Sequence, residues 1–152
     1  MVRITPMKDE YKDKFERFVS EQAKNDNVLL THFTASDSMD NKRSEILVCF
    51  DEEENILGIC KTSFTDLIGV LAIDYVYVKP DCRRDENGTL LVVAIMQRAV
   101  NRLIPRLICN TEINEINFAF LKKLGFTLTL QNEDRAFFTK NLLYMYKTEK
   151  HE

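Results

Sequence analysis

The 152-residue sequence predicts an α+β fold of α/β/α type, built on a mixed, mostly antiparallel, twisted sheet of six to seven strands with helices on both faces. Two observations lead to this prediction. Three strand-like runs follow one another with no helix pattern between them, which favours antiparallel pairing. A long apolar helix pattern and another short apolar run come next, which is the order of a parallel β-α-β crossover.

The first segment combines a strand signal with helix signals. Residues 2–4 are apolar and predict an edge strand, and Thr5-Pro6 is expected to supply the N-cap and first residue of a helix. Apolar side chains then recur at helical spacing between charged faces. These side chains are Met7, Tyr11, Phe15, Phe18 and Val19.

The region after this helix is polar. Residues 25–27 should end the helix, and residues 28–33 should form a short second one. Residues 34–43 show no hydrophobic period, so they are expected to form a loop. Such a loop either shapes a substrate site or is only a solvated connection.

Three strands are predicted in the middle of the chain. Residues 45–50 and 56–63 should form an antiparallel hairpin around the acidic turn at 51–55. That turn lacks the spaced oxygen ligands and the glycine of a calcium loop, so a solvated turn is expected. Gly69 then opens the third strand, residues 70–79.

The crossover follows the third strand. Seven consecutive apolar residues, 90–96, would suit a buried strand, but the apolar pattern continues at helical spacing to Leu103. A helix over about residues 87–103 is therefore predicted. Pro105 should mark its end, and residues 106–109 should form a central parallel strand.

The last third should contain one helix and two strands. Thr111 is the expected N-cap of the helix, Lys122-Lys123 suit its last turn, and Gly125 suits its C′ position. Its buried face is expected to carry Ile113, Ile116, Phe120, Leu121 and Leu124.

Two final strands are expected around a turn at residues 131–134. They should cover residues 126–130 and 136–146, and a charged tail, 147–152, should close the chain. Neither repeats nor a linker interrupts the pattern, so residues 1–152 are expected to form a single domain.

Composition narrows the class of protein. Apolar residues make up 45% and charged residues 30%, and the net charge is −3. An acidic balance argues against nucleic acid as a partner. No stretch approaches the roughly 20 apolar residues of a membrane span, so no membrane partner is expected and a cytoplasmic location is the simplest expectation.

The cysteines and histidines do not form a metal motif. Cys49, Cys60, Cys82 and Cys109 are scattered, and His32 and His151 are the only histidines. No metal is therefore expected. The cysteines should behave as small buried hydrophobes, with one alternative: the thiol of Cys82, next to two arginines, could be activated by positive charge.

Two motifs carry a family resemblance. Val78-Lys79-Pro80 ends the third predicted strand, and Arg83 through Gly88 follow it before the helix. Further along, Asn114 precedes a helix that closes with Leu124-Gly125-Phe126. In this order, the chain resembles the GNAT superfamily of acyl-CoA-dependent N-acyltransferases, whose signatures are V-x-P with R-x-x-G-x-G/A, and N-(x)n-F/Y-x-x-x-G-F.

Two positions depart from the family pattern. Glu86 stands where the first glycine of the loop lets backbone N–H groups approach the pyrophosphate of coenzyme A. Leu121 stands where many members carry a tyrosine that protonates the leaving thiolate. A thiol with a pKa near 8.5 is a tolerable leaving group, and general acid help is worth about 10²–10⁴-fold.

The resemblance implies a set of roles. Acetyl-CoA would be the co-substrate, and its acyl group would pass to an amine by direct attack. Asp74 would act as the base, or would only hydrogen-bond a neighbouring strand. The N–H of Val76 would polarise the thioester carbonyl, the main chain up to Val78 would bind the pantetheine arm, and Asn114 would touch that arm. The pyrophosphate would bind Arg83, Arg84, Asn87, Gly88 and Thr89.

Two functions remain open at this point. The first is an active N-acetyltransferase for a small-molecule or peptide amine. The second is a weak or inactive relative that binds acyl-CoA, another phosphorylated ligand or a protein partner. Glu86 and Leu121 favour the second, while Arg83, Gly88 and Asn114 favour the first. A homodimer is compatible with both.

Overall fold

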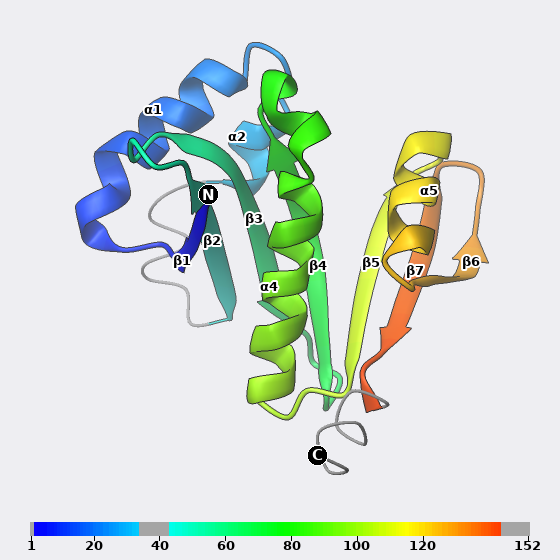
Figure 1. The fold of residues 1–152 in the computed structure, drawn as a ribbon. Helices are drawn as coiled ribbons and strands as arrows, with labels where there is room; N and C mark the ends of the chain where they lie inside the picture. Colours follow the sequence, from blue (N-terminus) through cyan, green and yellow to red (C-terminus); the bar gives the residue numbers. More distant parts are fainter. Residues whose placement is uncertain (1, 34–42, 144–152) are drawn as a thin grey trace. The chain divides into compact units, whose positions relative to one another are not determined.

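Seven strands of the described chain form one mixed sheet in the order β1-β2-β3-β4-β5-β7-β6 (Figure 1). The computed structural model describes residues 2–33 and 43–143. The strands are β1 (Arg3–Pro6), β2 (Ser44–Phe50), β3 (Ile56–Phe64), β4 (Val70–Val78), β5 (Arg106–Glu112), β6 (Thr127–Gln131) and β7 (Arg135–Asn141). The predicted mixed sheet is confirmed. Of the expected loop at 34–43, residues 34–42 lie outside the described residues, and so does the expected tail at 147–152.

The helices follow the predicted order. They are α1 (Lys12–Gln22), α2 (Leu29–His32), α4 (Asn87–Asn101) and α5 (Glu115–Lys123), with 3₁₀ turns η1 (Asp9–Tyr11) and η2 (Pro80–Asp85). No helix among these is long and apolar enough to cross a membrane. The chain divides into two units: unit 1 comprises Met1–Ser63 and Asp74–Ala94, and unit 2 comprises Phe64–Ile73 and Ile95–Glu152.

The start of unit 1 differs from the prediction. Thr5 and Pro6 belong to β1, where they pair with Val48 and Leu47 of β2, so the expectation of a helix start at Thr5-Pro6 was wrong. Proline is tolerated there because an edge strand has a row of N–H groups that faces no partner strand. The helix α1 begins at Lys12, after η1.

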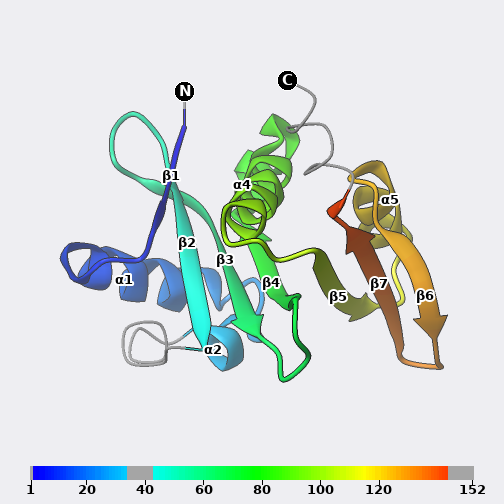
Figure 2. The ribbon, with the colours of Figure 1, turned by 90° about the horizontal axis from the view of Figure 1, so that it is seen from below.

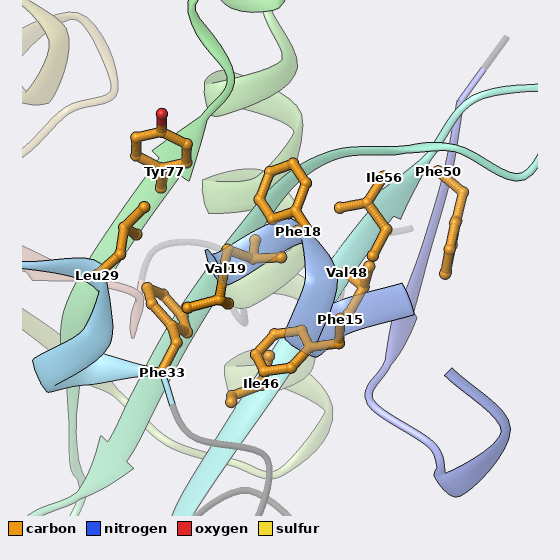
Figure 3. Packing of buried hydrophobic residues seen from close by; sticks show 11 residues of the cluster. Phe15, Phe18, Val19, Leu29, Phe33, Ile46, Val48, Phe50, Ile56 and Tyr77 are labelled. Carbon is orange, nitrogen blue, oxygen red and sulfur yellow. The ribbon is translucent and has the colours of Figure 1, made fainter. Parts of the chain in front are cut away.

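One face of the unit 1 strands packs on α1 and α2. Side chains of β2 alternate, so that Ile46, Val48 and Phe50 enter a cluster with the apolar stripe of α1. Figure 3 shows this cluster, with Phe15 and Phe18 of α1 among the strand side chains. The cluster consists of Phe15, Phe18, Val19, Leu29, Phe33, Ile46, Val48, Phe50, Ile56, Ile59 and Tyr77.

The other face of these strands packs on the first half of α4. Gly58 of β3 makes this possible, because a Cβ there would lie 2.8 Å from the carbonyl oxygen of Tyr77 and 3.2 Å from Cδ1 of Leu91. Helices therefore cover both faces of the unit 1 strands, as predicted.

Unit 2 contains the parallel pairing. Residues Val70–Ile73 of β4 run parallel to β5, and β5 runs antiparallel to β7. Among the described strands, β6 pairs with β7 alone and forms the edge, next to β7 in Figure 2. β7 ends at Asn141, so residues 142 and 143 of the predicted strand 136–146 are not part of it, and residues 144–146 lie outside the described residues.

The helix of unit 2 begins later than predicted. Thr111 lies inside β5, and Asn114 is the N-cap of α5, so the N-cap prediction was wrong. Ile113 and Ile116, expected on the buried face, are 45% and 79% exposed. Leu121 is buried, and the ring of Phe118 packs edge-on against Phe138 at 5.3 Å between centroids. Gly125 has φ +88°, as its predicted C′ position requires.

Candidate functional site

The segment from β4 through η2 to α4 carries most of the predicted site residues, and the part that holds them, Asp74–Ala94, belongs to unit 1. β4 ends at Val78, and Lys79 is extended with φ −61° and ψ 145°. Pro80 opens η2, which runs to Asp85. Glu86 follows as a single residue, and α4 starts at Asn87.

Glu86 adopts a glycine-like backbone. Its φ is 60° and its ψ is 22°, which is the left-handed region. For a residue with a side chain this conformation costs on the order of 1 kcal/mol. The loop therefore keeps the turn that a glycine would supply, although the side chain is a carboxylate.

The first turn of α4 offers backbone donors. The N–H of Leu90 is the first to bond within the turn, to the carbonyl of Glu86 at 3.0 Å. Among the described residues, no hydrogen bond is made by the N–H groups of Asn87, Gly88 or Thr89. Such amides at a helix N-terminus suit a phosphate group.

Arg83 is held at the end of β4. Its Nε donates to the carbonyl oxygen of Val78 at 2.8 Å, and its guanidinium lies 5.3 Å from the ring centroid of Tyr77. Its two terminal nitrogens donate no hydrogen bond within the described part of the chain. These terminal nitrogens are therefore able to donate to an anion. The carbonyl oxygen of Val78 already accepts from Nε of Arg83.

Asn87 has a role inside the loop. Its side chain is 2% exposed, and its Nδ2 donates to the carbonyl oxygen of Cys82 at 3.0 Å. This bond ties η2 to the start of α4. Asn87 thus has its backbone N–H for a ligand, while its side chain holds the loop in place.

The thiol of Cys82 is not activated. Burial, followed by the Asp81 carboxylate, raises the pKa of this thiol above its ordinary value. The thiol therefore stays protonated at neutral pH, and the sequence-based alternative of an activated Cys82 was wrong. Cys49 and Cys60 are fully buried, as small hydrophobes would be.

Asp74 is hydrogen-bonded to the neighbouring strand. The hydroxyl of Ser63 on β3 donates to Oδ2 of Asp74, which is half-buried. No other described residue bonds this carboxylate. Ser63 fixes one oxygen and leaves Oδ1 for a proton. No sequence signal singled out Ser63, because its position opposite Asp74 depends on strand register.

Tyr75 and Tyr77, which follow Asp74 on β4, bond to residues at and just after the end of α1. The hydroxyl of Tyr75 donates to Asp26, and that of Tyr77 donates to Oε1 of Gln22 at 2.8 Å. Tyr77 is buried, and Tyr75 packs against the core cluster. Both therefore serve packing, and Val76 lies between them on β4.

Asn114 belongs to unit 2, unlike the other predicted site residues. Its Oδ1 accepts from the N–H groups of Ile116 at 2.8 Å and Asn117 at 3.2 Å. The side chain is thus engaged in capping α5. Its contact with the pantetheine arm stays a prediction.

Metal ligation finds no support in the described residues, which contain no cluster of His, Cys, Asp and Glu able to hold an ion. The donors that the segment does provide are backbone amides and a guanidinium. This donor set fits a phosphorylated ligand.

A family model decides the family. The acetyltransferase (GNAT) family model matches residues 5–126, which include β4, η2, α4, β5 and α5 and end just before β6. The chain belongs to the GNAT acetyltransferase family. This GNAT domain therefore has the fold on which acyl groups are transferred from acyl-CoA. No curated protein gives a match.

Solved structures share the GNAT fold. A GNAT acetyltransferase from Staphylococcus aureus has a TM-score of 0.74 at 17% identity, covering 93% of this chain and 99% of that one. The PaiA N-acetyltransferase from Thermoplasma acidophilum, in complex with coenzyme A, has a TM-score of 0.71 at 12% identity, covering 93% and 99%.

The ribosomal-protein-S18-alanine N-acetyltransferase from Escherichia coli has a TM-score of 0.71 at 13% identity, covering 93% of this chain and 94% of that one. At these identities the likeness concerns the fold alone. Substrates of these proteins are therefore not transferred to this GNAT chain.

Proposed function

We propose that this GNAT protein is an N-acetyltransferase that transfers an acetyl group from acetyl-CoA to a small-molecule or peptide amine. The observation that carries the proposal is the left-handed backbone of Glu86 followed by the three N–H groups at the start of α4. This left-handed turn is the one that a glycine would supply in a phosphate-binding loop, and it supports the proposal. We further propose that the protein acts in the cytoplasm.

The pyrophosphate of the coenzyme would bind at this turn. The N–H groups of Asn87, Gly88 and Thr89 would donate to it, together with the terminal nitrogens of Arg83. Arg84 is proposed as a second cation. The N–H of Val76 would polarise the thioester carbonyl, the main chain up to Val78 would bind the pantetheine arm, and Asn114 would contact that arm.

Asp74 is proposed as the base. The amine nitrogen would form its bond to the thioester carbon, the C–S bond would break, and the amine proton would pass to Oδ1 of Asp74, directly or through a water. Ser63 would hold the carboxylate by donating to Oδ2. The thiolate would leave without help from position 121, where the side chain is leucine.

Thermal unfolding with and without acetyl-CoA tests the binding step. At 100 times the dissociation constant, the coenzyme should stabilise the protein by about 2.7 kcal/mol. For a chain of this length, that corresponds to a rise in Tm of roughly 5–10 °C. No rise at millimolar acetyl-CoA would refute the proposal.

A second candidate function is acyl-CoA binding without turnover, and Leu121 favours it. The leucine is buried in α5 and supplies no acid. Release of free thiol from acetyl-CoA, measured over a panel of small amines and peptides, separates the two functions. A rise in Tm with no thiol release for any amine would select the binding protein.

The variant Asp74→Asn tests the base. Loss of general base help should lower kcat/KM by about 10²–10⁴-fold near neutral pH, with a smaller loss at high pH where the amine is already neutral. The rise in Tm with acetyl-CoA should be unchanged. Ser63→Ala, which frees the carboxylate, should reduce activity less, and equal activity of Asp74→Asn and wild type at every pH would remove the role.

A further inference from the structure

A groove lies in unit 1 on the side of α1, apart from the residues that form the turn at Glu86. Its volume is about 240 Å³, and three elements line it. Five lining residues come from α1, two from the β2–β3 turn, one from the start of β3, and the last is Lys79 after β4. The lining residues are Lys14, Arg17, Phe18, Glu21, Gln22, Glu54, Asn55, Ile56 and Lys79.

The charges of the groove do not cancel. Three cations, Lys14, Arg17 and Lys79, line it with two carboxylates, Glu21 and Glu54. The carboxylate of Glu54 is already paired, because its Oε2 lies 2.6 Å from Nη2 of Arg3, which is not a lining residue. The groove is thus lined by Lys14, Arg17 and the partly paired Lys79, with Glu21 as its one carboxylate that makes no ion pair within the described residues.

Two of the three cations, Lys14 and Arg17, make no ion pair within the described residues. Nζ of Lys14 donates to the neutral backbone carbonyl of Glu54 at 3.0 Å. Nζ of Lys79 lies 4.0 Å from Oδ2 of Asp81, at the outer limit of an ion pair. Arg17 makes no ion pair within the described residues.

The floor of the groove is fixed. Phe18 and Ile56 are each 7% exposed and belong to the core cluster drawn in Figure 3. Oε1 of Gln22 accepts from the hydroxyl of Tyr77 at 2.8 Å, which leaves the Nε2 donor of Gln22 to the groove. The groove thus offers several donors above a rigid apolar floor.

We propose that this groove binds a phosphate monoester. A phosphate monoester carries a charge of about −1.5 to −2 and three acceptor oxygens, which match three separate cations better than the single charge of a carboxylate does. The volume is below the roughly 300–1,000 Å³ of drug-sized pockets, so the groove takes the phosphate end of a ligand.

The phosphate can come from two sources. One is the 3′-phosphate of the coenzyme, since Lys79 directly precedes Pro80 and η2. The other is a separate phosphorylated molecule. The groove itself does not depend on the proposed acyl transfer, because its residues and charges stand without it.

Titration with inorganic phosphate at constant ionic strength tests the site. Amide NMR shifts should saturate for residues of α1 and for Lys79. Removing one cation, in Lys14→Met or Arg17→Met, should weaken binding by about fivefold. Lys12→Met removes a lysine from the same helix outside the groove, and it should leave the affinity unchanged.

Glu21→Gln gives a readout that misfolding cannot mimic, because removing the unpaired carboxylate should tighten binding. The proposal is overturned if shifts do not saturate at tens of millimolar phosphate. It is also overturned if Lys12→Met weakens binding as much as Arg17→Met, or if Glu21→Gln weakens it.

Comparison of coenzyme A with 3′-dephospho-coenzyme A identifies the source. If the 3′-phosphate occupies the groove, its removal weakens binding to wild type and has no further effect in Arg17→Met. Equal affinity of wild type for both identifies a separate phosphorylated molecule. Failure of both coenzymes to bind tells against the acetyl-CoA proposal alone, since the inorganic phosphate titration stands independently.

Discussion

The helices α4 and α5 differ in how the backbone N–H groups of their first turns are bonded. At the start of α5, the side chain of Asn114 accepts from the N–H groups of Ile116 and Asn117. At the start of α4, the side chain of Asn87 turns away and donates to the carbonyl of Cys82. One asparagine closes its helix end, and the other leaves three amides for a ligand.

This difference shows that an asparagine at a helix start has no fixed role. Asn114 precedes its helix with an extended backbone, φ −152° and ψ 123°, from which a side chain reaches the N–H groups two and three residues on. Asn87 is already the first helical residue, and the residue before it, Glu86, is left-handed. Backbone geometry, not residue type, decides which end can bind an anion.

The largest loss of stability is expected from disturbing the close packing of α4 on Gly58 of β3. Gly58→Ala would bring a Cβ to 2.8 Å from the carbonyl oxygen of Tyr77 and 3.2 Å from Leu91 Cδ1. The backbone of β4 cannot move aside cheaply, so unfolding in urea should show a loss of about 2–3 kcal/mol. A loss below about 1 kcal/mol would show that α4 does not depend on this contact.

Removing the cap of α5 should have an intermediate effect. Asn114→Ala should cost about 1 kcal/mol of stability, and Asn114→Asp should cost little, since both Asn and Asp cap well. Urea unfolding measures both variants. If Asn114→Asp keeps its stability but binds acetyl-CoA more weakly, Asn114 also contacts the coenzyme, and equal losses for both variants would contradict the capping role.

The smallest stability effect is expected at Glu86. Glu86→Gly relieves the left-handed backbone but frees the unfolded chain, so the net gain should be about 0.5 kcal/mol. Acetyl-CoA binding should tighten severalfold, because a carboxylate is removed beside the phosphate. Leu103→Gly is the matched control: its φ is also 60°, so it should gain similar stability without any change in affinity. Weaker binding by Glu86→Gly would show that the carboxylate supports the loop.

The fold could be predicted from the sequence where a hydrophobic pattern is long or where a residue such as glycine has a special backbone conformation. The apolar period of α4 ran over enough residues to override the strand-like run at 90–96, and Gly125 ended α5 with the positive φ that only glycine adopts readily. The predicted helix start at Thr5-Pro6 was wrong because of a tertiary contact. Pairing of Thr5 with Val48 outweighed a local N-cap signal.

The site was less accessible because it depends on geometry that residue types do not encode. The sequence does not indicate that Glu86 would adopt a left-handed backbone, which is rare for glutamate. It also does not indicate that Ser63 of β3 would hydrogen-bond to Asp74 of β4. Thr111 was mistaken for the cap because β5 continues to Glu112 before the helix can begin. The motif positions were identified, but the use of each side chain was not.

The reactivity of the Lys140 amine should report local opening within unit 2. This lysine of β7 is 6% exposed, and its Nζ lies 2.5 Å from where a Cβ of Gly125 would stand, at the end of α5. Lys122 and Lys123, one turn earlier, are exposed. An amine-reactive reagent followed by peptide mass spectrometry should modify Lys122 and Lys123 at once, and Lys140 only as fast as α5 separates from β7.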